Sequence, residues 1–182
     1  MLYPLPVVMV SCGDSPANRN IVTVAWAGTV CSSPPMVSIS LRKSRHSHAI
    51  ISRTGEFVVN LTTEGLVFAT DWCGVKSGRD VDKWEAMGLT PLASRSVAAP
   101  SIAESPVSIE CRVRQVVELG SHDMFIADVL GVRVRDRFVD PASGELDLGR
   151  VGLICYSHGE YYSLGRTLGR FGFSVRKARR RG

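Results

Sequence analysis

The chain has 182 residues, of which 45% are apolar and 21% charged, which is typical of one soluble folded domain and excludes a disordered chain. No apolar run approaches the roughly 18 to 20 residues of a membrane-spanning helix, so we expect no membrane span. Residues 1–6 contain two prolines and no basic segment, so we expect no secretory signal and predict a cytoplasmic location. The net charge of +5 comes from the basic tail, residues 176–182, because without its five cations the chain is close to neutral.

The first part of the chain predicts strands. Residues 6–11 and 21–26 are short apolar runs rich in β-branched residues, and the Gly, Asp, Ser, Pro and Asn residues between them predict a turn. Residues 31–35 contain two prolines and predict a loop. Residues 36–41 alternate apolar and polar side chains, as a half-buried strand does.

The middle of the chain predicts short helices around one more strand. Residues 44–52 have an apolar stripe and offer Ser44 or Ser47 as the N-cap of a helix. Residues 56–61 predict the strand. The further elements expected here are a helix, a surface loop and a helical turn that ends at Gly88, at residues 66–72, 74–83 and 83–87.

The second half again predicts strands. Residues 107–118 and 124–134 alternate over long stretches around a turn at residues 120–123, and Gly131 marks a bulge or a close approach. Many short strands with few helices favour an antiparallel barrel over alternating βαβ units. We therefore predict an all-β fold with a few short helices, in a single domain over residues 1–182.

Familiar catalytic and metal motifs do not occur in the sequence. It contains no G-x-G-x-x-G, P-loop, H-E-x-x-H or G-x-S-x-G pattern, so no catalytic residue is predicted. The five cysteines are widely spaced without a C-x-x-C pair, and we expect reduced thiols that mostly pack as small apolar side chains. The four histidines lack ligand spacing, so no metal site is predicted.

Residues 40–48 leave a strand, enter a predicted helix and are rich in hydroxyls and cations. The free N–H groups and dipole of a helix start, together with fixed cations, favour a phosphate. A capped, solvated helix start explains the same composition, and both interpretations stay open. Likewise, residues 23–28 are either barrel wall or a place where small side chains let a flat ring approach the backbone.

Residues 20–35, 40–48 and 56–61, in this order, resemble the flavin reductase-like, FMN-binding split-barrel family, and its flavoredoxin-type branch in particular. The stretches 77–84 and 161–174 extend the resemblance to nearly the whole chain. It implies an antiparallel Greek-key split β-barrel. It also implies a homodimer with FMN, in preference to FAD, bound near the subunit interface.

The resemblance also implies a set of cofactor contacts. Asn20 and the strand residues after it would line the ribityl chain and ring, the residues at the end of the next strand would present their backbone to the ring edge, and those at the helix start would hold the phosphate. These cofactor residues are Asn20, Thr23, Val24, Ala25, Trp26, Ser40, Leu41, Arg42, Ser44, Arg45, Ser47 and His48.

Four more residues are candidates for substrate contact. Lys76 and Arg79 would meet a nucleotide phosphate, and His158 and Tyr162 would approach the ring. For each of them surface exposure or structural packing is an equal alternative.

Three hypotheses of function follow. The first is an FMN-dependent oxidoreductase that passes electrons from NAD(P)H, a transient co-substrate, to a flavin, a metal chelate or a protein acceptor. The second is a non-enzymatic, FMN-bound electron carrier that does not use nicotinamide directly. The third is a basic module that binds nucleic acid through residues 176–181, which we do not expect because no nucleic-acid-binding motif accompanies the tail.

Overall fold

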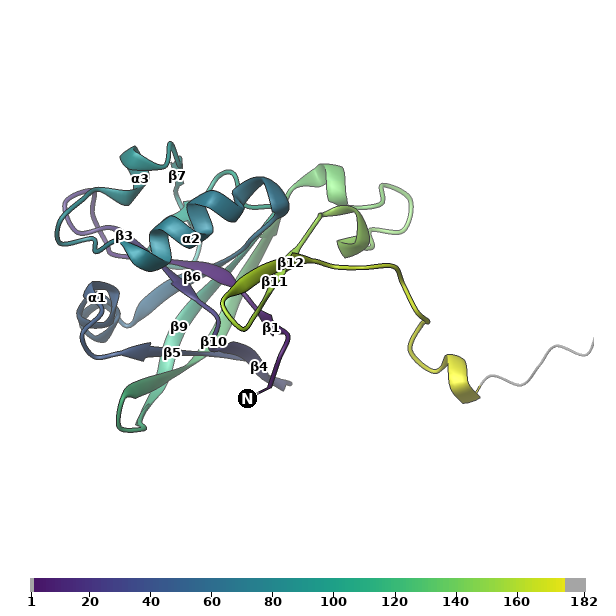
Figure 1. The fold of residues 1–182 in the computed structure, drawn as a ribbon, viewed down its shortest axis with the longest axis horizontal. Helices are drawn as coiled ribbons and strands as arrows, with labels where there is room; N and C mark the ends of the chain where they lie inside the picture. The colour runs from purple at the N-terminus through teal and green to yellow at the C-terminus, as the bar shows by residue number, and fades with distance from the viewer. Residues whose placement is uncertain (1, 176–182) are drawn as a thin grey trace, which may run out of the picture.

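Strand-forming residues from both halves of the chain form one large antiparallel sheet (Figure 1). The structure is a computed structural model and describes residues 2–175. Within these residues the sheet has seven strands in the order β3-β2-β6-β9-β10-β5-β4. Their bounds are Val8–Cys12 (β2), Asn20–Val24 (β3), Ala27–Ser32 (β4), Pro35–Arg42 (β5), Glu56–Leu61 (β6), Val107–Glu118 (β9) and His122–Val134 (β10).

The sheet curls so that its two edge strands, β3 and β4, follow each other in the chain. Only Ala25 and Trp26 separate them, and the Ser40 N–H of β5 donates to the Trp26 carbonyl at 2.8 Å. Strand β6 pairs with β2 and β9, and β5 pairs with β10, so neighbours in the sheet are often distant in sequence. The predicted antiparallel split barrel, all-β with a few short helices, is confirmed.

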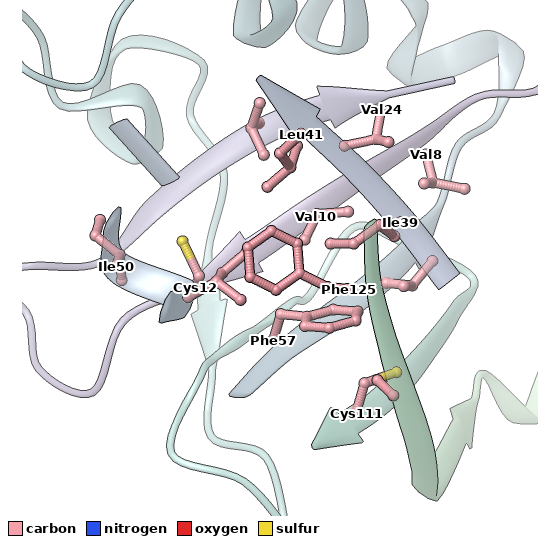
Figure 2. Packing of buried hydrophobic residues seen from close by; sticks show 14 residues of the cluster. Val8, Val10, Cys12, Val24, Ile39, Leu41, Ile50, Phe57, Cys111 and Phe125 are labelled. Carbon is pink, nitrogen blue, oxygen red and sulfur yellow. The ribbon is translucent and has the colours of Figure 1, made fainter. Parts of the chain in front are cut away.

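The inside of the curl holds the main apolar cluster (Figure 2). Phe57 of β6 and Phe125 of β10 are fully buried there, and Ile39 of β5 packs with them. Alternate residues of each strand point to this side, as the period of two requires. The cluster fixes the registers of the strands whose ends form the site, because a slip of one residue would turn these side chains outward.

Helix α1 (His46–Thr54) follows β5 directly and closes one end of the barrel. The prediction of Ser44 or Ser47 as N-cap is wrong: the N-cap is Arg45, whose side chain makes no capping hydrogen bond within the described residues, and Ser47 lies inside the helix. The helix begins later than predicted because residues 42–45 first form a turn, in which the Arg45 N–H donates to the Arg42 carbonyl. Its first N–H groups are therefore left without a side-chain cap.

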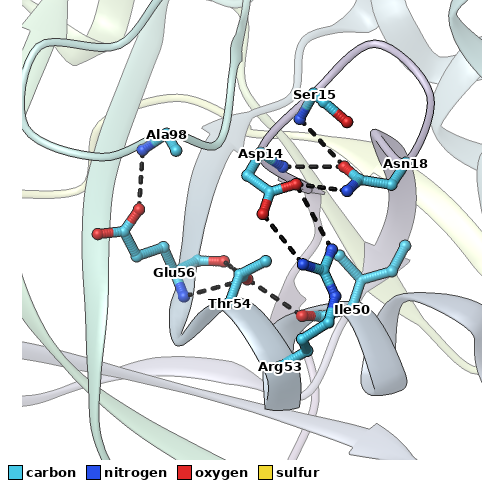
Figure 3. A network of polar contacts seen from close by, with 8 residues as sticks. All are labelled: Asp14, Ser15, Asn18, Ile50, Arg53, Thr54, Glu56 and Ala98. Atoms are coloured by element: carbon cyan, nitrogen blue, oxygen red, sulfur yellow. Dashed lines mark hydrogen bonds and ion pairs between the residues drawn. The ribbon is translucent and has the colours of Figure 1, made fainter.

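The other end of α1 is anchored to the body (Figure 3). Arg53 pairs with Asp14 of the β2–β3 turn at 3.0 Å, and Gly55 ends the helix with φ 68°. The Thr54 hydroxyl donates to the Ile50 carbonyl at 3.1 Å. These contacts set the direction of the helix and so the position of its start.

Two further helices cover β3. Helix α2 (Val67–Val75) follows the 3-10 turn η1 (Glu64–Leu66), and α3 (Lys83–Ala86) begins at Asp82, whose side chain accepts from the N–H groups of Trp84 and Glu85. The predicted helical turn ending at Gly88, with φ 60°, is confirmed. A second apolar cluster joins these helices to the sheet and includes Met9, Ile21 and Trp84. The short strands β7 (Pro91–Leu92) and β8 (Ser101–Ile102) pair next to it.

The loop predicted over residues 31–35 is wrong. Strand β4 runs to Ser32 and β5 starts at Pro35, so only Ser33 and Pro34 form the turn. The small, largely exposed residues of β4 lack the apolar alternation of a half-buried strand, and pairing with β5 holds this edge strand in place. The predicted irregularity at Gly131 is confirmed, because the β9–β10 register shifts between Val129 and Gly131.

The last third of the chain adds a small sheet that the sequence did not reveal. Strands β11 (Ile154–Ser157) and β12 (Glu160–Ser163) pair with each other, and β11 pairs with β1 (Leu5–Pro6). Short 3-10 turns η2 (Asp136–Phe138) and η3 (Leu148–Arg150) precede it. After β12 the chain leaves the body, and η4 (Phe173–Val175) lies away from it (Figure 1). The basic tail, residues 176–182, lies outside the described residues.

Candidate flavin groove

Two pockets meet at the end of the barrel where β3, the link of Ala25 and Trp26 and the end of β5 come together. The large pocket has a volume of about 530 Å³ and the basic pocket of about 300 Å³. Val22, Arg42 and Arg45 line both. The two pockets are therefore parts of one continuous groove.

The large pocket has a floor of strand residues and a wall of aromatic rings. Residues 23–26 and 40–42 form the floor, and Gly74 and Val75 of α2 form one side. The other lining side chains include Asp71, His122, Tyr156 and Tyr161. The Trp26 and His122 rings are nearly parallel, with an angle of 8° between their planes and 6.2 Å between their centroids. Trp26 is 45% exposed. An exposed tryptophan in a groove presents a flat apolar surface to a ligand.

The contact between α2 and β3 is close enough to require a small residue. A Cβ at Gly74 would lie 3.1 Å from the Thr23 Cβ, and the Thr23 hydroxyl donates to the Thr70 carbonyl. The Thr23 side chain therefore holds α2 against β3. This contact fixes one side of the large pocket relative to its floor.

The basic pocket concentrates positive charge at the start of α1. Within residues 2–175 its lining contains no Asp or Glu, while its lining cations are Arg42, Arg45, Lys76, Arg79 and Lys83. The uncapped first turn of α1 adds N–H groups and the positive end of the helix dipole. The guanidinium of Arg79 donates to the Ser44 carbonyl at 3.1 Å and thereby closes the loop over this end. The pocket is built for an anion.

A buried pair of polar side chains forms the inner wall of the basic pocket. Asn20 Nδ2 donates to Ser47 Oγ at 2.9 Å, and both residues are buried. The loop after α2 comes so close that a Cβ at Gly78 would lie 2.1 Å from Asn20 Oδ1. Only glycine fits there without a shift of the loop or of Asn20. The Ser47 hydroxyl accepts from Asn20 and also lies within hydrogen-bond reach of the buried Cys12 sulfur.

Lys83 is a site residue that sequence reasoning missed. It is 4% exposed, and its ammonium donates to the carbonyls of Ile21 at 2.8 Å and Cys73 at 2.6 Å, which leaves a third N–H for the pocket. Burial lowers the pKa of Lys83 to about 8. The sequence signal was Asp82, a typical N-cap residue, which places Lys83 at the first position of a short helix next to the buried Trp84. Burial and the charges of Arg79 and Lys83 also lower the pKa of His46 in the same pocket.

The predicted cofactor residues, with one exception, line this groove. The exception is His48, whose Nε2 lies 2.7 Å from Asp123 Oδ2 and whose ring packs edge-on against Phe125 at 5.3 Å. Ser47 and His48 are neighbours on the helix, and the turn of about 100° between them points His48 away from the pocket. His48 ties α1 to β10 behind the groove.

The predicted substrate residues divide into two pairs. Lys76 and Arg79 line the basic pocket. His158 and Tyr162 line neither pocket. Alternation along β12 directs Tyr161 inward and Tyr162 outward, whereas His158 lies in the turn before β12 and its ring packs on Tyr3 with centroids 4.4 Å apart. The Tyr161 hydroxyl donates to Asp71 of α2 at 3.0 Å, and burial together with this bond raises the pKa of the phenol. The period of two in residues 160–163 was the signal that identifies Tyr161.

Two classes of site are not found in the described residues. Within residues 2–175 no group of three or more His, Cys, Asp or Glu side chains is placed to hold a metal ion. No helix in this range is long and apolar enough to cross a bilayer.

Several known proteins are similar to this chain in sequence or in fold. The solved structure of flavoredoxin from Desulfovibrio vulgaris matches with a TM-score of 0.89 and 30% identity, over 97% of this chain and 95% of that one. An uncharacterised protein of Archaeoglobus fulgidus is 35% identical over 139 residues, 76% of this chain and 77% of that protein. The FMN reductase (NADH) RutF of Stutzerimonas stutzeri is 29% identical over 132 residues, 68% of each. Residues 1–165 match the family described as flavin reductase like domain. The chain belongs to the flavin reductase-like family.

Proposed function

We propose that the groove binds FMN, with the phosphate in the basic pocket and the isoalloxazine ring in the large pocket. The observation that carries the proposal is the junction of a flat, aromatic-walled pocket with an anion pocket through Val22, Arg42 and Arg45. The volume of about 530 Å³ lies within the usual range of small-molecule sites, about 300 to 1,000 Å³. The two halves of the groove match the two ends of one FMN molecule.

At the phosphate end, Arg45, the hydroxyl of Ser47 and the third N–H of Lys83 are the proposed donors. Lys76 and Arg79 line the same pocket, so we assign them to this phosphate rather than to a nicotinamide nucleotide. A terminal phosphate dianion suits this set of cations. That match supports FMN in preference to FAD.

At the ring end, the backbone of residues 23–26 and 40–42 faces the isoalloxazine edge, and Trp26 and His122 supply the flat wall. When bound, FMN supplies hydride and single-electron transfer. The task of the protein is to bind, orient and shield the ring, so we assign no side chain as a general acid or base. The proposed electron donor is NAD(P)H, and the proposed acceptor is a flavin, a metal chelate or a protein.

A second function has its own support. The solved structure matched at 30% identity over 97% of this chain is a flavoredoxin. A bound-FMN electron carrier that receives electrons from a protein rather than from nicotinamide uses the same groove. The two functions differ in the electron donor and not in the site.

Two measurements in sequence test the proposal. FMN is first titrated into the apoprotein and followed by flavin fluorescence and visible absorbance, and failure to bind at micromolar concentrations would reject it. The holoprotein is then mixed without oxygen with NADH or NADPH in a stopped-flow instrument. Flavin bleaching within the turnover time supports the oxidoreductase, and inertness to both supports the carrier.

We further propose that the protein is a homodimer, as the family resemblance implies. Sedimentation equilibrium tests this, because a dimer has twice the mass of the 19.8 kDa chain, and a mass of one chain would reject the proposal.

A further inference from the structure

The segment after β12 exposes an unusual amount of apolar surface. We call residues 164–175 the arm, which extends away from the barrel (Figure 1). Its large apolar side chains are exposed by 60% or more: Leu164, Leu168, Phe171, Phe173 and Val175. A run of this kind marks a surface that packs against something else.

The arm has few contacts with its own barrel. The Leu164 N–H still donates to the Leu153 carbonyl at 3.4 Å. Beyond it, within the described part of the chain, the backbone hydrogen bonds of the arm join only arm residues, such as Phe173 N–H to the Arg170 carbonyl. Phe171 is as exposed as in an extended peptide, at 105%. The arm is therefore anchored at one end and open along the rest.

A surface of matching character lies on the outer face of η1 and α2. Glu64, Phe68, Asp71 and Val75 are exposed and follow one another at helical spacing. Phe68 is 72% and Val75 69% exposed. We call these four residues the stripe. It alternates carboxylates with large apolar side chains.

The arm and the stripe are complementary in charge. Arg166 and Arg170 lie between the apolar residues of the arm, and residues 161–175 contain no Asp or Glu. On the stripe the charges are Glu64 and Asp71. Apolar contact supplies the stabilisation, and the opposite charges set the direction and register.

We propose that the arm of one copy packs on the stripe of a second copy, in a reciprocal two-fold exchange. Twelve residues reach up to about 40 Å when extended, whereas a helix of nine residues is only about 14 Å long, so the arm has the length to reach a neighbouring copy. Arm and stripe belong to the same chain, so a two-fold axis satisfies both at once. The occupant of the stripe is thus a second copy of this protein.

The exchange places the partner chain at the flavin groove. Asp71 and Val75 of the stripe also line the large pocket. The partner's arm, once seated on the stripe, covers one side of the mouth of the pocket and contributes to the site. This consequence rests on the proposed function, whereas the exchange itself does not require a flavin.

The test is a crosslink in the full-length protein. A photoreactive benzoylphenylalanine replaces Phe171, and this protein is mixed with an unmodified, isotope-labelled copy before irradiation. The expected product joins the modified arm to a labelled peptide that contains residues 64–75. Crosslinks only within one chain, or to a different surface of the partner, would overturn the exchange even if FMN binds as proposed.

Point variants give a second readout without truncating the chain. Phe171→Asp and Phe68→Asp are each expected to raise the dimer dissociation constant at least about tenfold, as loss of a central apolar contact does. Val132→Asp is the matched control, because Val132 is 56% exposed on β10 and lies outside both arm and stripe. If the control dissociates the dimer and the two variants do not, the interface lies on the sheet and the proposal is wrong.

Discussion

The ammonium of Lys83 is buried and lines the basic pocket. Burial lowers its pKa to about 8, although two carbonyls accept from it. A phosphate dianion in the basic pocket favours the charged form and raises this pKa on binding. FMN binding is then linked to proton uptake by Lys83 at alkaline pH.

The sign of the pH effect follows from this linkage. Below pH 8 Lys83 is already charged before FMN binds, so its contribution to FMN affinity does not change with pH. As the pH rises through about 8, binding must first protonate the amine, and FMN affinity falls. Riboflavin lacks the phosphate, so its affinity is expected to stay constant. Fluorescence titrations of both ligands on each side of pH 8 measure the difference. Lys83→Met should remove the step, and a step of equal size for riboflavin would disprove the assignment.

Gly78 carries the second prediction at this scale. Because a Cβ there would lie 2.1 Å from Asn20 Oδ1, Gly78→Ala must displace Asn20 or the loop. We expect FMN affinity to fall at least about tenfold, roughly 1.4 kcal/mol, with a much smaller change in melting temperature. Gly28→Ala is the control, because its Cβ meets nothing within 4 Å among the described residues. Equal affinities for the two variants would show that the loop does not shape the phosphate site.

At the scale of elements, two polar contacts, His48 with Asp123 and Arg53 with Asp14, tie α1 to the rest of the fold and differ in burial. The side chain of Asp123 is only 6% exposed, and its Oδ2 lies 2.7 Å from His48 Nε2. In the other contact, the side chains of Arg53 and Asp14 are 54% and 39% exposed. Exposed pairs contribute little because water screens both charges. Removing one partner of a buried bond leaves the other unsatisfied.

The helix contacts should therefore differ in their effect on stability. Asp123→Ala is expected to lower the free energy of unfolding by about 1 to 3 kcal/mol, and Arg53→Ala by less than about 1 kcal/mol. Denaturant unfolding of the apoprotein measures both changes in free energy. Lys43→Ala serves as a check, because the Lys43 ammonium lies 3.5 Å from Asp123 Oδ1. A larger loss of unfolding free energy in Arg53→Ala than in Asp123→Ala would mean that the exposed contact at the end of α1 stabilises the helix more.

The elements differ in how far the sequence predicts them, for identifiable reasons. Strands with β-branched or alternating runs, such as β5 and β9, were predicted because their own residues carry the pattern. Strand β4 was missed because its small exposed residues are held by pairing with β5. The hydroxyls and cations of residues 40–48 already indicated a possible anion site, which the resemblance interpreted as a flavin-phosphate site. Neither identified Lys83 or Tyr161, whose places depend on contacts with distant elements.

At the scale of the whole molecule, the groove is assembled from three parts that are far apart in sequence. Strands β3 to β5 give the floor, the region of α1, α2 and α3 gives the basic end, and the small β1-β11-β12 sheet gives one aromatic wall. The hydrogen bond from Tyr161 to Asp71 joins that wall to α2. The two ends of the groove should therefore respond separately to substitution.

The binding of FMN and of riboflavin to the same variants distinguishes the ring end of the groove from the phosphate end. Tyr161→Phe removes the hydrogen bond to Asp71, so the aromatic wall is no longer tied to α2. Both ligands should then dissociate several-fold faster, because both carry the ring. Lys83→Met should weaken only FMN, since only FMN carries the phosphate. Tyr162→Phe is the matched control for the wall: its hydroxyl bonds to Glu160 on the same strand and faces away from the pocket. If Tyr162→Phe accelerates ring release and Tyr161→Phe does not, the wall faces the other way and the ring must lie elsewhere in the groove.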